Sequence, residues 1–238
     1  MNRIYVYLVM ILLTEYFQSD PARRKEFDVC LAENIKNDSI EKIILFIDNP
    51  SVNPTDNFLE SDKIRIHRTP DRPTYQDFFI FCNSNLSGET CIIANADIIV
   101  GKDIDKAESH PDFGNMFIAL TRWDLSRKDD GTFSSTFFDN HRGIARVSQD
   151  TWVFKSPIRI AGCNFPMGKP GCDNKVAHIA KNSGYIVTNP SLQIKTYHLH
   201  ESGIRKYNGS DVIPPPWQMV PPTDNINTFS ELTEEWPF

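Results

Sequence analysis

The 238-residue chain has few cysteines, no excess of basic residues and no long apolar run. Its five cysteines are an odd number without a Cys-x-x-Cys pair, which argues against a disulfide framework and against a zinc knuckle. Reduced thiols and a cytoplasmic location are therefore expected. Acidic residues outnumber basic ones by 31 to 25, so the charge disfavours a general nucleic-acid binder.

The longest apolar run covers residues 4–13 and is too short to span a bilayer. Arg3 precedes it, as a basic residue precedes the core of a secretory signal, but no small-residue cleavage site follows at residues 14–18. The run is β-branched, aromatic and aliphatic throughout. We therefore predict a strand that is buried on both faces, and no membrane span.

Strand-like and helix-like stretches alternate along most of the chain. Helices are predicted after Asp20-Pro21, after the capping-box sequence that begins at Thr74, and over residues 173–182. Strands are predicted over residues 4–13, 43–47, 64–67, 91–100, 117–121, 147–154 and 194–199. This alternation predicts an α/β fold with a mainly parallel sheet, in a single domain over residues 1–210.

Two segments depart from the alternation. Residues 126–146 are polar and punctuated by glycine, which predicts a mobile loop over a site. Residues 211–238 hold six of the 16 prolines and five acidic residues without a Lys or Arg. That composition predicts a semi-rigid tail or a linker to a further domain, and we expect its deletion to leave ligand binding intact.

The strand predicted over residues 91–100 carries two polar side chains, Asn95 and Asp97, on the same side. Ligands bind at the ends of central strands in open α/β sheets, and a carboxylate beside a core needs a partner. Mg²⁺ or Mn²⁺ bridging to a diphosphate would supply one. The alternative is that Asp97 starts a turn or pairs with an arginine.

Two histidines, His198 and His200, share a side at the end of the last predicted strand. Either is a candidate for a metal ligand or for a donor to a leaving phosphate, and the alternative is a hydrogen-bonded structural residue. The spacing is not that of a zinc site, because no third cluster of ligands accompanies it.

An amide and an acid, Gln149 and Asp150, open another predicted strand beside an aromatic residue, which suits recognition of hydroxyl groups. Asp173 follows a glycine-containing turn, where an N-cap role would account for it fully. The turn matches neither the dinucleotide fingerprint nor a P-loop. Arg72 and Tyr75 flank a proline turn that suits stacking on a base and pairing with phosphate.

Together these stretches resemble the GT-A-type nucleotide-sugar glycosyltransferases, most closely the compact domains encoded by chlorella viruses and other large DNA viruses. The resemblance runs through residues 14–24, 72–79, 94–98, 119–124, 148–154, 165–177 and 196–201. It implies a single GT-A, Rossmann-like domain whose mixed, mostly parallel sheet is flanked by helices. It also implies the cytoplasm, of a host cell if the protein is viral.

The metal motif of that family is Asp-x-Asp, and here it reads Asn95-Ala96-Asp97. By resemblance Asp97 binds the metal together with His198, which is preferred over His200, and Asn95 and Ala96 contact the nucleotide sugar. The resemblance further implies a pocket for the base and the ribose, lined by Thr14, Tyr16, Arg24, Arg72 and Tyr75. Asp150, Asp173 and Gln149 then face the transferred sugar and the acceptor.

The implied activity is transfer of a hexose from a UDP-sugar, glucose-like or rhamnose-like, to a glycan or glycoprotein acceptor, with Mn²⁺ or Mg²⁺ and with retention of configuration. Two alternatives stay open. A sugar nucleotidyltransferase would be expected to carry a glycine-rich, lysine-containing loop, and residues 14–24 contain no glycine. A non-catalytic nucleotide-sugar-binding module is compatible with Asn95 in place of the first acid.

Overall fold

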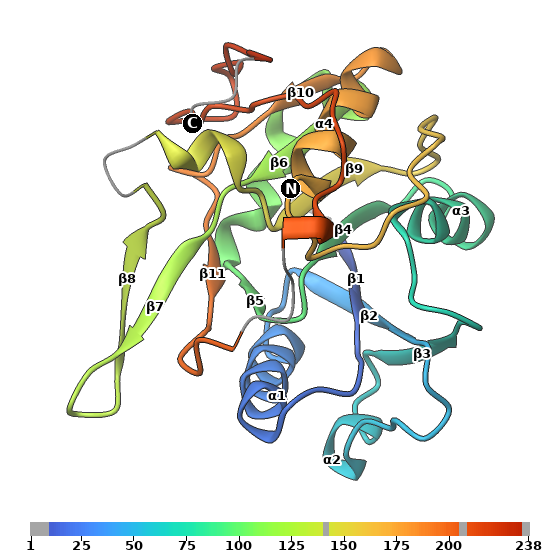
Figure 1. The fold of residues 1–238 in the computed structure, drawn as a ribbon, viewed down its shortest axis with the longest axis vertical. Helices are drawn as coiled ribbons and strands as arrows, with labels where there is room; N and C mark the ends of the chain where they lie inside the picture. The colour runs from blue at the N-terminus through green and yellow to red at the C-terminus, as the bar shows by residue number, and fades with distance from the viewer. Residues whose placement is uncertain (1–9, 140–142, 205–208, 235–238) are drawn as a thin grey trace, which may run out of the picture.

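The computed structural model describes residues 10–139, 143–204 and 209–234. Its larger sheet has seven strands in the spatial order β10-β6-β9-β4-β1-β2-β3 (Figure 1). These strands are β1 (Met10–Glu15), β2 (Ile40–Ile47), β3 (Ile64–Arg68), β4 (Thr90–Ala94), β6 (Met116–Leu120), β9 (Thr151–Lys155) and β10 (Ile186–Thr188). Only β9 runs antiparallel to its two neighbours, and the other pairs of this sheet are parallel. The predicted α/β fold with a mostly parallel sheet is confirmed.

A second sheet has four strands in the order β5-β11-β7-β8. They are β5 (Ile98–Val100), β7 (Trp123–Arg127), β8 (Phe133–Phe137) and β11 (Thr196–His198). The α-helices are α1 (Pro21–Ile35), α2 (Asp56–Leu59), α3 (Tyr75–Asn85) and α4 (Cys172–Asn182). Short 3₁₀ turns are η1 (Lys102–Ser109), η2 (Phe113–Asn115), η3 (Ile144–Val147) and η4 (Gly209–Asp211).

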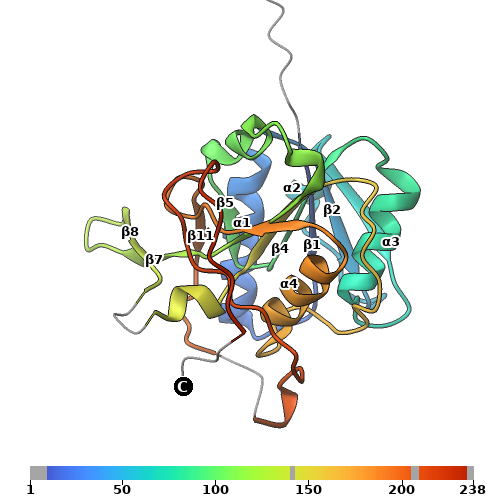
Figure 2. The same ribbon diagram turned by 90° about the horizontal axis from the view of Figure 1, so that it is seen from above.

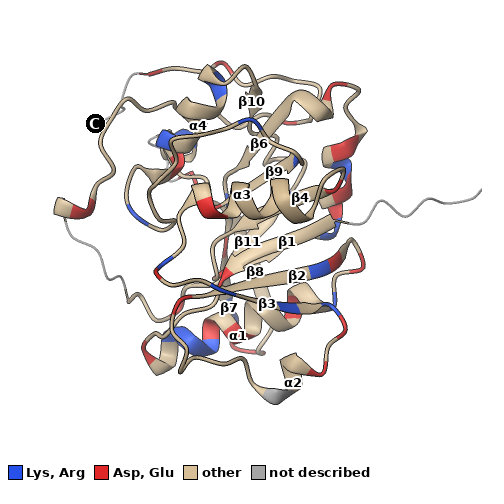
Figure 3. Cartoon of the chain, turned by 90° about the vertical axis from the view of Figure 1, so that its right-hand side faces the viewer, with Lys and Arg blue, Asp and Glu red and all other residues tan. Residues whose placement is uncertain are grey.

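Helices cover both faces of the larger sheet, because successive side chains of a strand point to opposite faces. Ile11 and Leu13 of β1 belong to a core with α3 and α4, whereas Met10 and Leu12 belong to a core that includes Leu31 of α1. Figure 2 shows α1 on one side of the sheet and α3 and α4 on the other. Charges of both signs are interspersed over the outer helices and loops, and the middle of the sheet carries few (Figure 3).

Two of the three predicted helix starts are confirmed. The Asp20 carboxylate accepts a hydrogen bond from the Ala22 N–H at 2.9 Å, with Pro21 at the first helical position. Thr74 and Asp77 form the reciprocal capping box of α3. The helix over residues 173–182 is also present, but Asp173 as its N-cap was wrong. Gly171 occupies the N-cap position with a left-handed backbone, and Asp173 lies in the first turn.

The single strand predicted over residues 91–100 was wrong, because the chain leaves one sheet and enters the other within it. β4 ends at Ala94, the Ile98 N–H donates to the Asn95 carbonyl at 3.1 Å, and β5 then pairs with β11. Asn95 and Asp97 therefore lie in a turn between two sheets. The first predicted strand is present from Met10 onward, and residues 4–9 lie outside the described residues. The short elements α2 and β10 were not predicted.

The mobile loop predicted over residues 126–146 was wrong for most of its described part. β7 and β8 form an antiparallel hairpin that projects from the body in Figure 1, and η3 follows it. Gly131 has a φ of +81° in the hairpin turn, a backbone conformation that glycine adopts readily. The pattern was missed because β8 is polar and mostly exposed, so it lacks the apolar alternation of a half-buried strand. Residues 140–142 lie outside the described part.

The described residues beyond position 210 pack against the body. Met219, Val220 and Ile226 are buried, and Val220 joins the core that contains α3 and α4. The Gln218 N–H donates to the Asn174 carbonyl at 2.9 Å. A domain boundary at residue 210 stays a prediction. In the described part of the chain, no helix combines the length and the apolar character that crossing a membrane requires.

Candidate functional site

A cavity of about 580 Å³ lies where the carboxyl ends of β1, β4 and β6 meet the amino end of the antiparallel strand β9. This is the edge at which open α/β sheets bind ligands, and the volume falls in the usual range for small-molecule sites. Glycines and polar residues of the loop before α4 form part of its wall, and residues after β11 form another part.

Three candidate metal ligands meet at one end of this cavity. Ligand atoms of Asp97, His198 and His200 all lie within 4.8 Å of one another, and we call these residues the Asp-His-His cluster. Asp97 Oδ2 lies 3.1 Å from His198 Nε2, and the other ring nitrogen, Nδ1, lies 2.9 Å from Asp124 Oδ1. The structure thus brings together the predicted pair Asp97 and His198 and adds His200 to it.

Asp97 and His198 shift each other's pKa values in opposite directions. Burial alone would lower the pKa of His198, but its hydrogen bonds to Asp124 and Asp97 raise this pKa to about 9. Burial alone would raise the pKa of Asp97, but His198 and Arg23 outweigh it and hold that pKa well below its ordinary value. In this structure the pair is therefore an ionised carboxylate against a protonated imidazole at neutral pH.

Arg23, in the first turn of α1, also contacts the cluster. Its Nη2 donates to Asp97 Oδ2, and its Nη1 donates to Glu26 Oε2. The alternative raised for Asp97, pairing with an arginine, therefore occurs. Sequence reasoning missed Arg23, because 74 residues separate it from Asp97 and no local pattern joins them.

A chain of side chains connects the cluster to the opposite wall of the cavity. Asp124 Oδ1 accepts from Arg122 Nε at 2.9 Å, and Arg122 Nη1 donates to Asp150 Oδ2 at 2.8 Å. The other oxygen of Asp150, Oδ1, accepts from Asn95 Nδ2 at 2.8 Å. Burial would lower the pKa of Arg122, but Asp150 and Asp124 outweigh it and raise the pKa. The predicted sugar-facing acid Asp150 is thus held by two donors.

Gln149 and Asp173 lie together on the wall beside Asp150. The Gln149 backbone N–H donates to Asp173 Oδ2 at 3.0 Å, and Gln149 Nε2 donates to the Ala145 carbonyl at 3.1 Å. Gln149 Oε1 is buried and has no hydrogen-bond partner among the described residues. Burial, assisted by the charge of Asp150, raises the pKa of Asp173 to about 7 against the backbone hydrogen bonds that lower it. This wall therefore offers acceptor atoms and a carboxyl group that titrates near neutral pH.

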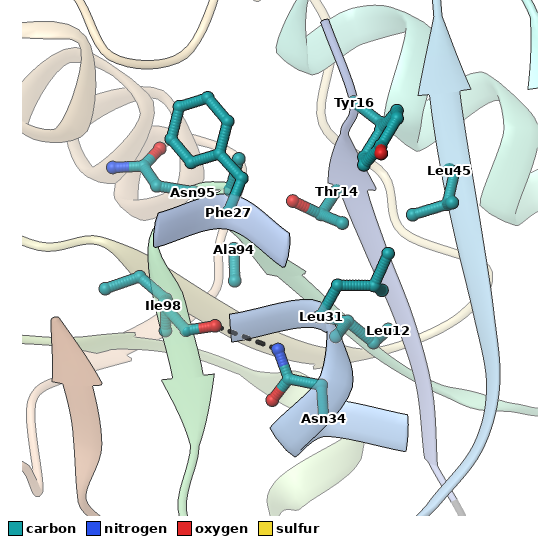
Figure 4. A pocket seen from close by; sticks show the side chains of 11 residues that line it. Leu12, Thr14, Tyr16, Phe27, Leu31, Asn34, Leu45, Ala94, Asn95 and Ile98 are labelled. Atoms are coloured by element: carbon teal, nitrogen blue, oxygen red, sulfur yellow. Dashed lines mark hydrogen bonds between the residues drawn. The ribbon is translucent and has the colours of Figure 1, made fainter. Parts of the chain in front are cut away.

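The residues predicted for a base pocket divide between two faces of the sheet. Thr14 and Tyr16 line a second, water-sized pocket of about 10 Å³ between β1 and α1, which adjoins the large cavity at Phe27, Asn95 and Ala96 (Figure 4). Arg24 stacks on the Tyr16 ring at 4.1 Å and does not line the large cavity. The large cavity is lined instead by Glu15 and Phe17. The alternation of side chains along β1 was the signal that could have separated the two sets.

Arg72 does line the large cavity, whereas Tyr75 does not. Arg72 Nε and Nη2 lie 3.1 and 3.2 Å from the two carboxylate oxygens of Glu15. Burial raises the pKa of Glu15 more than Arg72 lowers it. Tyr75 is fully buried, with its ring edge-to-face against Trp152 at 5.0 Å between centroids. Asn95 and Ala96 both line the cavity, and their contact with a nucleotide sugar stays a prediction.

No protein-family model and no curated protein sequence matches the chain significantly. Among solved structures, Staphylococcus aureus TarS 1–349 in complex with UDP-GlcNAc aligns with a TM-score of 0.53 and 11% identity, over 87% of this chain and 62% of that one. GalNAc-T7 with UDP, GalNAc and Mn²⁺ aligns with a TM-score of 0.50 and 9% identity, over 88% and 45% of the two chains.

A third structure, 4-diphosphocytidyl-2C-methyl-D-erythritolsynthase from Anaerococcus prevotii, has a TM-score of 0.46 and 12% identity over 86% of this chain and 95% of that one. The two matches with the higher TM-scores show the fold. The chain has a GT-A, Rossmann-like fold, and it spans about half of GalNAc-T7 and less than two thirds of the TarS chain.

Proposed function

We propose that the protein transfers a hexose from a UDP-sugar to a glycan or glycoprotein acceptor, with the help of a divalent cation. The observation that carries this proposal is the position of the Asp-His-His cluster. Three potential metal ligands converge at one end of a cavity large enough for a nucleotide sugar, at the switch edge of a GT-A-like sheet.

The donor set of the cluster fits a cation that also binds phosphate. One carboxylate and two imidazoles suit Mn²⁺ better than Mg²⁺, which prefers oxygen ligands alone. We assign Asp97, His198 and His200 as the residues that would hold the ion, and His198 would release its proton when the ion binds. When bound there, the cation would neutralise the negative charge that develops on the departing diphosphate.

The nucleoside is assigned to the β1 end of the cavity. Phe17 offers a ring and Arg72 a guanidinium, whose planar shape suits stacking and hydrogen bonding to a base. Glu15 offers carboxylate oxygens to an N–H or hydroxyl group of the nucleoside. Glu15 and Phe17 thus replace Thr14, Tyr16, Arg24 and Tyr75 as the proposed residues of the base and ribose pocket. Arg72 keeps the role in this pocket that the sequence predicted.

The transferred sugar and the acceptor are assigned to the wall of Gln149, Asp150 and Asp173. Gln149 lines the cavity at this wall and is assigned to hydroxyl recognition. Asp150, whose position is fixed by Arg122 and Asn95, places negative charge where positive character develops on the sugar carbon. Asp173 orients the acceptor hydroxyl. We keep retention of configuration as the expected outcome.

The proposal is tested by incubating the protein with UDP-glucose or UDP-rhamnose, Mn²⁺ and a glycan acceptor, and by measuring released UDP. Release is expected to vanish in Asp97→Ala and to persist in Asp130→Ala, which changes an exposed acid of the β7–β8 hairpin turn. Binding without release in the presence of acceptors would indicate a non-catalytic binding module. Release of pyrophosphate from UTP and a sugar 1-phosphate would indicate a nucleotidyltransferase.

The anomeric outcome is read from the product by NMR. A retained configuration agrees with the expectation, and an inverted one would instead make Asp173 the acceptor of the hydroxyl proton, since its pKa of about 7 suits that role. The nature of the sugar and the acceptor, the cytoplasmic location, the viral relationship and a further domain after the proline-rich segment stay predictions.

A further inference from the structure

Arg23 places a cation on the same carboxylate that the proposed metal would use. Its side chain is 12% exposed, lines the cavity, and donates through Nη2 to Asp97 Oδ2. The same oxygen lies 3.1 Å from His198 Nε2. A divalent ion that binds Asp97 beside His198 therefore has to compete with the guanidinium of Arg23.

The two ends of the Arg23 guanidinium are held differently. Nη1 donates to Glu26 Oε2 and to the Leu199 carbonyl at 3.4 Å, and the other oxygen of Glu26 accepts from the Ser202 N–H at 2.6 Å. Glu26 is therefore fixed independently of Asp97. Nη2 has Asp97 as its partner, so loss of that contact would leave the side chain anchored through Nη1.

The other three described basic residues that line the cavity are each paired with carboxylates outside the Asp-His-His cluster. Arg72 is bound by both oxygens of Glu15, and Lys169 lies 2.9 Å from Asp211. Arg122 is held between Asp124 and Asp150 and lies over the Phe138 ring at 3.8 Å. Of these four described cations, Arg23 has the one direct contact with Asp97.

We propose that Arg23 releases Asp97 when the divalent cation binds and then binds the diphosphate of the substrate instead. This inference rests on the proposed function and deepens it. Without metal, Arg23 occupies Asp97. With metal, the ion takes Asp97, and the freed Nη2 turns toward phosphate oxygens while Glu26 holds Nη1. Arginine suits this exchange because its fork can bind a carboxylate on one edge and a phosphate on the other.

A purely structural role for Arg23 makes a different prediction. If Arg23 only ties α1 to the turn between β4 and β5, its removal should loosen Asp97 and weaken metal binding. If Arg23 competes with the metal, its removal should strengthen metal binding. The sign of the change in Mn²⁺ affinity therefore separates the two roles.

The first experiment titrates Mn²⁺ into nucleotide-free protein, with the free ion followed by electron paramagnetic resonance. Arg23→Met is expected to bind Mn²⁺ about tenfold more tightly than the unchanged protein, an effect close to the lower end of those measured for close charge pairs. The matched control is Lys25→Met, which removes one positive charge from an exposed position of the same helix. An Arg23→Met affinity equal to or weaker than that of the unchanged protein overturns the competition.

The second experiment titrates UDP into protein saturated with Mn²⁺, by calorimetry, because Nη2 is free of Asp97 only when the metal is bound. Arg23→Met is expected to bind UDP about tenfold more weakly, because a charge-assisted bond to the diphosphate is lost. Lys25→Met is expected to bind as the unchanged protein does. Unchanged UDP affinity in Arg23→Met overturns the phosphate role.

Two further measurements keep the outcomes distinct. Circular dichroism checks the fold, and if Arg23→Met does not fold, Arg23→Lys replaces it, because one ammonium group cannot contact Asp97 and Glu26 through two separate arms. Arg23→Lys is then expected to shift both affinities in the same directions by a smaller factor. Failure of the unchanged protein to bind UDP even with Mn²⁺ would refute the proposed function, whereas the Mn²⁺ titration judges the competition without any nucleotide.

Discussion

His198 Nε2 lies 3.1 Å from Asp97 Oδ2, although 101 residues separate them in the chain. The pairing depends on the turn that follows β4 and on the antiparallel pairing of β5 with β11, which sets His198 opposite Ile98. On its other side His198 is oriented by Asp124, the neighbour of Trp123 at the start of β7. Three segments therefore fix the position of one imidazole.

This arrangement makes Asp124 a positioning residue for the Asp-His-His cluster. Asp124→Asn is expected to lower Mn²⁺ affinity by roughly 10- to 100-fold, as loss of a carboxylate behind a metal-binding histidine usually does. Mn²⁺ titration measures the effect, and the pH dependence of binding should shift with it because the pKa of His198 loses one of its supports. Asp130→Asn, in the exposed turn of the same hairpin, serves as the control, and equal affinities for the two variants would contradict the assignment.

The two faces of β1 should respond differently to substitution. Phe17→Ala is expected to weaken UDP binding about tenfold, the order of one lost stacking contact with a base. Tyr16→Phe removes a hydroxyl that donates to Asp28 on the other face, at 3.0 Å, and is expected to change UDP affinity by less than about twofold. Calorimetry with Mn²⁺ present compares them, and a larger loss in Tyr16→Phe would restore the base pocket expected from the sequence.

Asp173 should make the stability of the protein depend on pH. Its folded pKa of about 7 exceeds the ordinary value of 3.8, so the native state keeps a proton that the unfolded chain has released. The free energy of unfolding is therefore expected to fall as the pH rises through this interval. Asp173→Asn removes this pH dependence. The free energy of unfolding of the variant, relative to that of the unchanged protein, should therefore rise by about 1–2 kcal/mol from pH 5 to pH 8, after allowance for the partial exposure of the side chain. Urea unfolding at both pH values measures this, and an equal difference at each would refute it.

The segment beyond residue 210 should contribute to stability. Val220→Ala is expected to lower the free energy of unfolding by about 1–3 kcal/mol, since Val220 is fully buried in the main core. Val212→Ala makes the same chemical change at a side chain that is 41% exposed, and should cost less than about 0.5 kcal/mol. Thermal and urea unfolding compare the pair.

Deletion of residues 211–238 is accordingly expected to destabilise the domain, whereas composition alone predicts that ligand binding survives the deletion. The deletion would remove the buried side chain of Met219 and expose the apolar surface that it covers. It would also remove the hydrogen bond from the Gln218 N–H to the Asn174 carbonyl in α4. A truncated chain that unfolds at the same urea concentration as the full chain would support an independent tail instead.

The sequence alone was sufficient for features that depend on a few neighbouring residues. The helix start at Asp20-Pro21 and the capping box of Thr74 and Asp77 involve side chains that bond to the adjacent backbone, so both were predicted correctly. The alternation of apolar strands and helices predicted the α/β class for the same reason. It also marked Asp97 and His198 as polar positions at the ends of strands.

The tertiary structure decided which of these positions meet, because such contacts depend on the order of the strands and on their register. It joined Arg23 to Asp97, divided residues 90–100 between two sheets, and turned Glu15 rather than Thr14 or Tyr16 toward the large cavity. Composition predicted a tail from its prolines and acids, yet buried Val220 depends on a surface formed by distant residues of the core. No pattern within a short stretch of chain contains that information, since burial is a property of the neighbours that folding supplies.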